Sequence, residues 1–133
     1  MSNYTEKLRK HNLKVTPQRL AICEALHVNG HLSIDDLYNV MLKKFSSLSL
    51  ATIYKNVNLM VKSSFIKEIK IPNAKSIYEL IKDSHAHLVC EKCGSVEDAD
   101  INIDFVISDV LKNQNFKVNN IDLVLSGICK KCQ

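Results

Sequence analysis

Cysteines that could bind a metal ion form two short pairs in this chain of 133 residues. Each pair has the spacing Cys-x-x-Cys, and the four residues are Cys90, Cys93, Cys129 and Cys132. Two such pairs are typical of a closed, tetrahedral zinc site built from four thiolates. Four unrelated buried cysteines are the alternative, but two pairs of this spacing rarely arise by chance. The pattern therefore predicts a structural Zn(II) site that ties the C-terminus to the middle of a domain.

Two histidines precede the first cysteine pair and are predicted to belong to a different site. The segment 85–90 is predicted to be a strand, in which successive side chains point to opposite faces. His85 and His87 then share one face, while Cys90 lies on the other. We therefore expect two metal sites back to back: the closed thiolate site, and a second one with nitrogen and oxygen ligands that can exchange its metal.

The composition is that of an ordinary soluble protein. Hydrophobic residues make up 46% of the chain and charged residues 24%, which is usual for a globular domain. No apolar run approaches the roughly 20 residues of a membrane span, and no signal peptide opens the chain. We expect a cytoplasmic protein with no membrane partner, whose reduced cysteines bind metal rather than form disulfides. A thioredoxin-like redox pair would need a strand–helix–strand context that the pattern lacks.

The net charge of +4 is unevenly distributed along the chain. Residues 1–78 contain 12 Lys and Arg against 5 Asp and Glu, a net charge of +7. Residues 79–133 contain 6 against 9, a net charge of −3. A basic half followed by an acidic, ligand-rich half suggests nucleic-acid binding followed by sensing.

The first half of the chain is predicted to contain four helices. Residues 3–11 form the first of them. N-cap residues precede the other three: Thr16, Ser33 and Ser49. The fourth helix, residues 50–61, has one apolar face, Leu50 included, and one small, polar face with two lysines. Such a face suits a recognition helix in a DNA major groove, and a solvated surface helix is the alternative for this segment alone.

A hairpin is predicted to follow the fourth helix, with strands at 65–71 and 76–81. Helices followed by such a hairpin make a winged helix-turn-helix. The hairpin lysines are expected on the phosphate backbone, which supplies affinity without sequence specificity. These residues are Lys67, Lys70 and Lys75.

The second half of the chain is predicted to be a small α/β domain. Strands are expected at 86–90 and 95–98, followed by a helix with apolar residues at helical spacing over 103–111, and by a strand over 116–126. The fold class is therefore α+β, with a winged helix-turn-helix domain at 1–81 and a dimerisation and metal-sensing domain at 82–133. A domain of roughly 50 residues is marginal alone, so zinc and a partner subunit are expected to stabilise it.

The chain resembles the ferric uptake regulator family over nearly its whole length. The resemblance rests on Leu13–Arg19, Ser49–Lys55, the segment 85–94 and the terminal cysteine pair. It implies a homodimeric, metal-responsive bacterial transcription regulator, usually a repressor, that binds a palindromic double-stranded DNA operator. It implies no small organic ligand and no enzymatic activity.

The resemblance also implies which residues contact DNA. Lys14 would reach into the minor groove, while Tyr54 and Lys55 would meet bases or backbone in the major groove. Arg19 and Thr52 are expected in the same DNA-binding set.

A regulatory metal site between the two domains is a further implication of the resemblance. Its ligands would be His31, Glu79, His85, His87 and Asp98. Three imidazoles and two carboxylates suit Fe(II) or Mn(II) and would also accept zinc. Because these ligands come from both domains, metal binding would fix the angle between them and so the spacing of the two recognition helices in a dimer.

Three positions favour the peroxide-sensing branch of the family over the iron-uptake branch. Asp98 is typical of peroxide sensors, and Ala86 and Ile121 replace a carboxylate and a histidine of iron-uptake members. In that branch, bound Fe(II) reacts with peroxide and a ligating histidine is oxidised, with His31 and His85 as candidates here. Glu79 departs from this pattern, since peroxide sensors typically have Asp there. Iron-uptake regulation is the first alternative, followed by zinc, manganese or nickel sensing.

Two other functional classes compete with a DNA-binding regulator. A catalytic metal centre would need a general base and a substrate pocket, which the sequence does not indicate, and would leave the basic half unexplained. A zinc-stabilised interaction module would not need Lys14 or Tyr54. Cys23 lies on the buried stripe of its helix and is predicted to be a core residue rather than a redox thiol.

Overall fold

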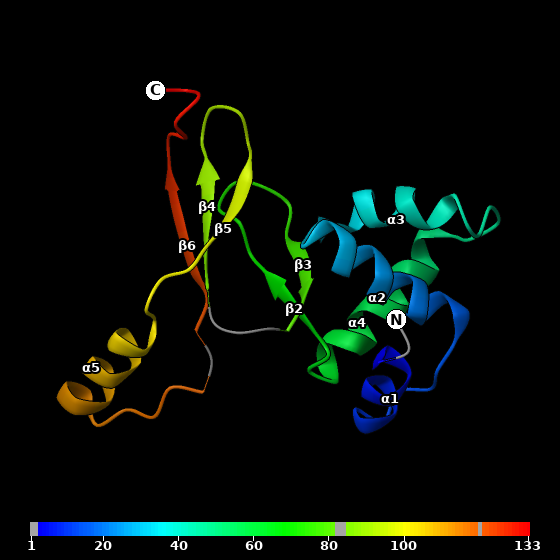
Figure 1. Cartoon of the computed structure of the whole chain (residues 1–133), viewed down its shortest axis with the longest axis horizontal. Helices are drawn as coiled ribbons and strands as arrows, with labels where there is room; N and C mark the ends of the chain where they lie inside the picture. The colour runs from blue at the N-terminus through cyan, green and yellow to red at the C-terminus, as the bar shows by residue number, and fades with distance from the viewer. Residues whose placement is uncertain (1–2, 82–84, 120) are drawn as a thin grey trace. The chain divides into compact units, whose positions relative to one another are not determined.

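The computed structural model describes residues 3–81, 85–119 and 121–133 and has the predicted mixed α+β fold. The chain divides into two compact units, Met1–Ile81 and Lys82–Gln133 (Figure 1). Within the described ranges, none of the helices combines the length and apolarity that a membrane span requires.

Four helices build the first unit, and their starts follow the predicted caps. They are α1 (Asn3–Lys10), α2 (Pro17–Asn29), α3 (Ile34–Leu42) and α4 (Leu50–Lys62). The hydroxyls of Thr16, Ser33 and Ser49 each accept a hydrogen bond of 3.2 Å from the backbone N–H three residues on. These bonds satisfy N–H groups that a helix start otherwise leaves without a partner.

The core of the first unit is formed by the apolar faces of these helices. Its largest fully buried side chains include Ile22 and Leu26 of α2, Leu37 and Met41 of α3, and Ile53, Val57 and Met60 of α4. Cys23 is also fully buried, which confirms its prediction as a core residue. Leu50 was predicted on the same face of α4 but is 36% exposed at the first residue of the helix.

A three-stranded antiparallel sheet, the wing, closes the first unit. Its strands are β1 (Leu32–Ser33), β2 (Ile66–Ile69) and β3 (Ile77–Leu80), in the order β1-β3-β2. The hairpin is confirmed, with strands shorter than predicted. The strand β1 was not predicted, because two residues are too short to show an alternating pattern; it pairs Leu32 with Tyr78.

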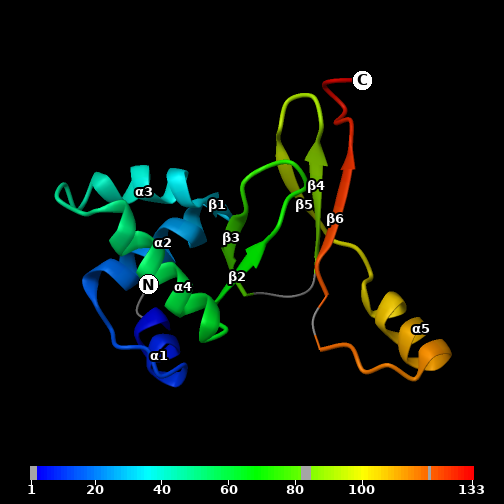
Figure 2. The same cartoon turned by 180° about the vertical axis from the view of Figure 1, so that it is seen from behind.

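The second unit is a three-stranded sheet with one helix. Its strands are β4 (Ala86–Cys90), β5 (Val96–Ala99) and β6 (Leu123–Gly127), in the order β5-β4-β6, and its helix is α5 (Asp104–Gln114). The central strand β4 pairs antiparallel with β5 and parallel with β6. Both views show β6 running beside β4 although 32 residues separate Cys90, the last residue of β4, from Leu123, the first of β6 (Figures 1 and 2).

One prediction for the second unit was wrong in part, and its helix has an exposed apolar stripe. The last strand was expected over 116–126, but the described residues 116–119, 121 and 122 lie in no strand. The strand starts only where β4 offers a hydrogen-bonding edge, opposite Ala86. The predicted helix is present as α5, and none of its residues, all of which are described, is buried in this unit. A helix can bury its stripe only against a second apolar surface.

Candidate metal centres and nucleic-acid interface

The four predicted zinc ligands come together at one end of the second unit. The Sγ atoms of Cys90, Cys93, Cys129 and Cys132 all lie within 4.8 Å of one another. The parallel register brings about this meeting, because Cys90 at the end of β4 is paired with Gly127 at the end of β6. Both strands therefore end at the same end of the sheet. One cysteine pair starts at the last residue of β4, and the other follows the last residue of β6.

The spacing of the sulfur atoms fits a tetrahedral zinc ion. The Sγ atoms of Cys93 and Cys129 are 3.8 Å apart. In a tetrahedron with zinc–sulfur bonds of about 2.3 Å, neighbouring sulfur atoms lie about 3.8 Å apart. No disulfide is formed by the five cysteines, which are all free thiols. The four-thiol group therefore suits the structural Zn(II) that the sequence predicts.

Hydrogen bonds lower the pKa of two of the four thiols. The N–H groups of Cys129 and Cys93 point at Cys90 Sγ, at 3.4 and 3.5 Å, and lower the pKa of Cys90 to about 6. Ser95 Oγ lies 3.2 Å from Cys93 Sγ and lowers the pKa of Cys93. Hydrogen bonds to the Cys129 and Cys90 thiols raise the pKa of Cys132 to about 12. Gathering negative charge among four sulfurs is unfavourable, so full ionisation here requires a cation.

A second group of ligands lies on the other face of β4. The Nε2 atoms of His85 and His87 are 3.2 Å apart. Asp98 Oδ1 lies 3.8 Å from His85 Nε2 and 3.5 Å from His87 Nε2. Asp98 is placed there by the antiparallel register, which pairs it directly with His87. The predicted division of histidines and cysteines between the two faces of this strand is confirmed.

The geometry of this group is compatible with one shared cation. Neighbouring ligands lie about 3.0 Å apart around an octahedral ion with bonds of about 2.1 Å, and about 3.4 Å apart around a tetrahedral one. The three observed distances are close to these values. Imidazole and carboxylate ligands suit Fe(II) and Mn(II), whereas the four sulfurs suit Zn(II). His87 is buried, so its ring is held firmly in place.

The other two predicted ligands, His31 and Glu79, belong to the first unit. Glu79 is a buried carboxylate on β3, with 2% of its surface exposed. His31 directly precedes β1, and the register pairs the next residue, Leu32, with Tyr78. Extending this antiparallel register by one residue places His31 opposite Glu79. The wing sheet thus holds an imidazole and a carboxylate at neighbouring positions.

The predicted DNA-contacting residues fall into two groups. Tyr54 and Lys55 are exposed on α4, and Lys14 is exposed in the loop between α1 and α2. Thr52 is half-buried, and its hydroxyl lies 2.9 Å from that of the cap residue Ser49. Arg19 is also half-buried, and two of its nitrogens donate hydrogen bonds within the protein, to Asn56 Oδ1 and to the Lys14 carbonyl.

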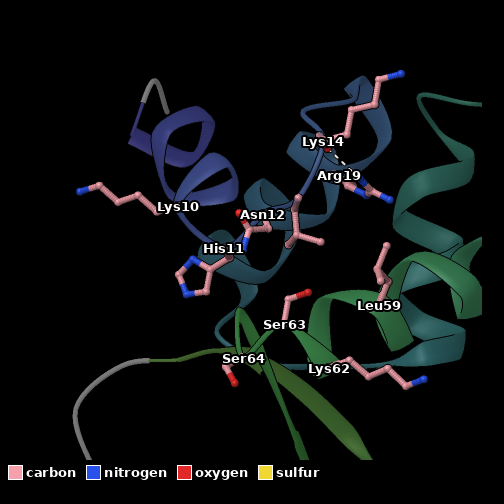
Figure 3. A pocket seen from close by; sticks show the side chains of 10 residues that line it. Lys10, His11, Asn12, Lys14, Arg19, Leu59, Lys62, Ser63 and Ser64 are labelled. Atoms are coloured by element: carbon pink, nitrogen blue, oxygen red, sulfur yellow. Dashed lines mark hydrogen bonds between the residues drawn. The ribbon is translucent and has the colours of Figure 1, made fainter.

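An open basic groove of about 690 Å³ lies beside this loop. Its charged lining residues are Lys10, Lys14, Arg19 and Lys62. Figure 3 shows the three lysine side chains extending in different directions, away from one another. They therefore spread positive charge over a surface rather than grip one small anion.

Two side-chain contacts within the first unit were not predicted from the sequence. Lys75 was expected on the DNA backbone, but its ammonium is paired with the Asp35 carboxylate at the start of α3, which raises the pKa of Lys75. The hydrogen bond from Arg19 to Asn56 joins residues 37 positions apart. No periodicity signals either contact, since each depends on the tertiary packing of the helices.

These features define a class of protein in which a winged-helix unit with an exposed polar helix is joined to a sheet unit with a four-thiol site and a separate imidazole–carboxylate group. The chain matches the model of the ferric uptake regulator family over residues 10–126, and it belongs to that family. Members of this family are metal-responsive transcription regulators that bind DNA and form dimers.

Three relatives show the range of the similarity. The chain is 34% identical to the peroxide operon regulator of Bacillus subtilis, over 96% of this chain and 89% of that protein. It is 29% identical to the ferric uptake regulation protein of the same organism, over 99% of this chain and 96% of that protein. It is 37% identical to the peroxide stress regulator of Campylobacter jejuni, whose crystal structure it matches with a TM-score of 0.81, over 96% and 97% of the two chains.

Proposed function

We propose that this protein is a metal-dependent bacterial transcriptional repressor that binds a palindromic DNA operator as a homodimer and senses hydrogen peroxide through a bound Fe(II) ion. The observation that carries the proposal is the group formed by His85, His87 and Asp98, which is separate from the four thiols. A protein with only a structural zinc ion would have no use for a second, sulfur-free set of ligands. An exchangeable metal on this set provides the signal.

The regulatory metal draws further ligands from the first unit, in this proposal His31 and Glu79. Support comes from the chemistry of the two side chains, since an imidazole and a carboxylate at neighbouring positions of the wing sheet are ligand types that Fe(II) and Mn(II) accept. A metal held by ligands from both units restricts how the units move relative to each other. Metal binding and DNA binding are then thermodynamically linked, each strengthening the other.

DNA is contacted by α4 in the major groove and by Lys14 in the minor groove, in the same proposal. Tyr54 and Lys55 are exposed on α4 beside each other, where they can reach base edges and phosphates. The net charge of +7 over residues 1–78 attracts the DNA backbone. A regulator of this kind performs no catalysis and needs no small organic ligand.

A second copy of the chain is proposed to cover the apolar surface of the second unit. Exposed apolar side chains in this unit include Phe105, Val106, Leu111 and Leu125, which are 71%, 41%, 53% and 46% exposed. Surfaces of this kind commonly mark interfaces. Dimerisation would place two recognition helices on two half-sites of a palindromic operator.

Peroxide sensing is favoured over iron-uptake regulation by Asp98 and by the higher identity to the two peroxide regulators. The iron-uptake alternative has support of its own: the carboxylate on β3 is Glu79 rather than the aspartate typical of peroxide sensors, and the ferric uptake regulation protein matches nearly the whole chain. His85, His87 and Asp98 would hold the ion, and Fe(II) would supply the electron that breaks the O–O bond of peroxide, whereas Mn(II) would not react readily. One oxygen atom of the peroxide would then be added to the ring of a ligating histidine such as His85, and the other would leave as water, so the histidine is the net reductant.

Operator binding by the zinc-loaded protein, measured under anaerobic conditions with added Fe(II) or Mn(II), tests this function. We expect no tight binding without the second metal, tight binding with either metal, and loss of binding after low peroxide in the Fe(II) form alone. The matched control is Asp98→Ala, which should retain zinc but lose the response to either metal. If both the Fe(II) and the Mn(II) form keep binding the operator in peroxide, the result supports iron-uptake regulation. Operator binding that does not depend on the second metal would contradict a metal-responsive repressor.

A further inference from the structure

One arginine connects the loop that carries Lys14 to helix α4. The Nη1 atom of Arg19 donates to the main-chain carbonyl of Lys14 at 2.7 Å, and its Nε atom donates to Asn56 Oδ1 at 3.2 Å. Figure 3 shows the guanidinium reaching the Lys14 main chain while the Lys14 side chain extends away from it. Two donors of a single planar group therefore hold two separate segments.

Asn56 is itself held in one orientation. Its Nδ2 atom donates to the Thr52 carbonyl at 3.2 Å and lies 3.4 Å from Gln18 Oε1. With its amide nitrogen directed at these acceptors, the amide oxygen is left to accept from Arg19. Asn56 directly follows Lys55 on α4, so the position of the guanidinium is tied to the helix that presents Tyr54 and Lys55.

We infer that Arg19 is a positioning residue for DNA binding: it fixes the main chain of Lys14 at a set distance from α4 instead of neutralising a phosphate itself. The inference rests on the proposed function, in which Lys14 and α4 enter neighbouring grooves. Contacts in two grooves add to specific affinity only when their separation matches the operator. Arginine is needed because its fork offers two donors in a fixed plane, whereas a lysine ammonium cannot reproduce that geometry.

The test is a double-mutant cycle on operator binding by the metal-loaded, zinc-containing protein. Arg19→Lys keeps the charge but loses the fork, so specific affinity should fall about tenfold, the usual size of one lost specific contact. Affinity for non-operator DNA should stay unchanged, because that binding depends on charge. In a Lys14→Ala background, Arg19→Lys should cost much less, since the residue that it positions is already gone.

Two further variants separate positioning from a phosphate contact and from simple misfolding. Arg19→Gln removes the charge. The slope of log affinity against log salt concentration should nevertheless stay unchanged, whereas the loss of a phosphate contact would reduce its magnitude by roughly 0.9. Lys10→Ala, in the same groove but outside the network, serves as the charge-removal control. Asn56→Ala releases the other end of the guanidinium and should reproduce the specific loss in a protein with an unchanged melting temperature.

The inference is overturned if Arg19→Lys binds the operator like the unmodified protein, if the Lys14 and Arg19 losses multiply in the double variant, or if Arg19→Gln lowers the salt dependence. Failure of the unmodified protein to bind any operator, with any metal, would instead contradict the proposed function. The two failures are therefore distinguishable in one set of titrations.

Discussion

At the scale of single residues, the five cysteines have very different surroundings. Cys23 is fully buried in the core of the first unit, and burial raises its pKa to about 12. Cys90 receives two backbone N–H groups, which lower its pKa to about 6. Because only the thiolate reacts or binds metal, these surroundings assign the thiols to different roles.

The first prediction concerns Cys23. Alkylation of the native, zinc-loaded protein at pH 8 should leave Cys23 unmodified, because its thiol is both inaccessible and protonated at that pH. Denaturation should expose it and restore an ordinary rate. Peptide mass spectrometry after a timed reaction gives the answer, and rapid native modification would contradict the assigned core position.

The second prediction concerns zinc affinity and pH. Cys90 with a lowered pKa is ionised above about pH 6, whereas Cys132 with a raised pKa stays protonated at neutral pH until zinc displaces its proton. Zinc binding at pH 7 should therefore release protons, and affinity should rise steadily from pH 6 to pH 8. Competition with a zinc chelator at several pH values measures this trend. A pH-independent affinity would exclude thiolate ligands.

At the scale of the elements, caps and registers position the functional side chains. Ser49 Oγ accepts from the Thr52 N–H and starts the helix that carries Tyr54 and Lys55. The two registers of β4 set Asp98 beside His87 and bring the two cysteine pairs to one end of the sheet. A change in a helix cap or in a strand register would therefore also displace functional side chains at other positions.

The third prediction is that Ser49→Ala lowers the free energy of unfolding by about 1 kcal/mol, the usual contribution of an N-cap hydroxyl. Urea denaturation monitored by circular dichroism measures the loss. Ser108→Ala, in the exposed middle of α5, is the matched control and should change stability by less than about 0.5 kcal/mol. Equal losses in both variants would show that the cap contributes nothing specific.

Elements with local signals could be predicted from the sequence, whereas those that depend on tertiary pairing could not. The helix starts could be predicted from the cap residues Thr16, Ser33 and Ser49, because each hydroxyl accepts from the backbone N–H only three residues further along the chain. The alternation over 116–126 predicted a strand of the wrong length, because its start depends on the distant partner β4. The two metal-ligand groups were predictable in part: strand alternation separates His87 from Cys90, but only the register shows that Asp98 faces His87.

At the scale of the whole molecule, two metals have different tasks in this account. Zinc holds the C-terminal cysteine pair to the end of β4 and so closes the second unit, which is small and leaves much apolar surface exposed. The regulatory metal is proposed to link the two units. In this proposal zinc is needed for folding of the second unit, and the regulatory metal is needed for the change in DNA binding.

The fourth prediction follows from this division of tasks. Removal of zinc by a strong chelator, or the substitution Cys132→Ser, should lower the melting temperature sharply and dissociate the dimer, because structural zinc contributes directly to folding free energy. Removal of Mn(II) alone should leave both properties nearly unchanged while operator binding is lost. Native mass spectrometry and thermal unfolding distinguish the two cases. An unchanged melting temperature without zinc would contradict a structural role.

The most direct test of the central claim is peptide mass spectrometry of the Fe(II)- and Mn(II)-loaded proteins after brief exposure to low peroxide. We expect the Fe(II) form alone to gain the mass of one oxygen atom on the peptide containing His85 or on the one containing His31, in step with its loss of operator binding. Asp98→Ala, which weakens the site, should abolish the change. If the Fe(II) form releases DNA with both histidines unmodified, or keeps DNA throughout, the protein does not sense peroxide through this site.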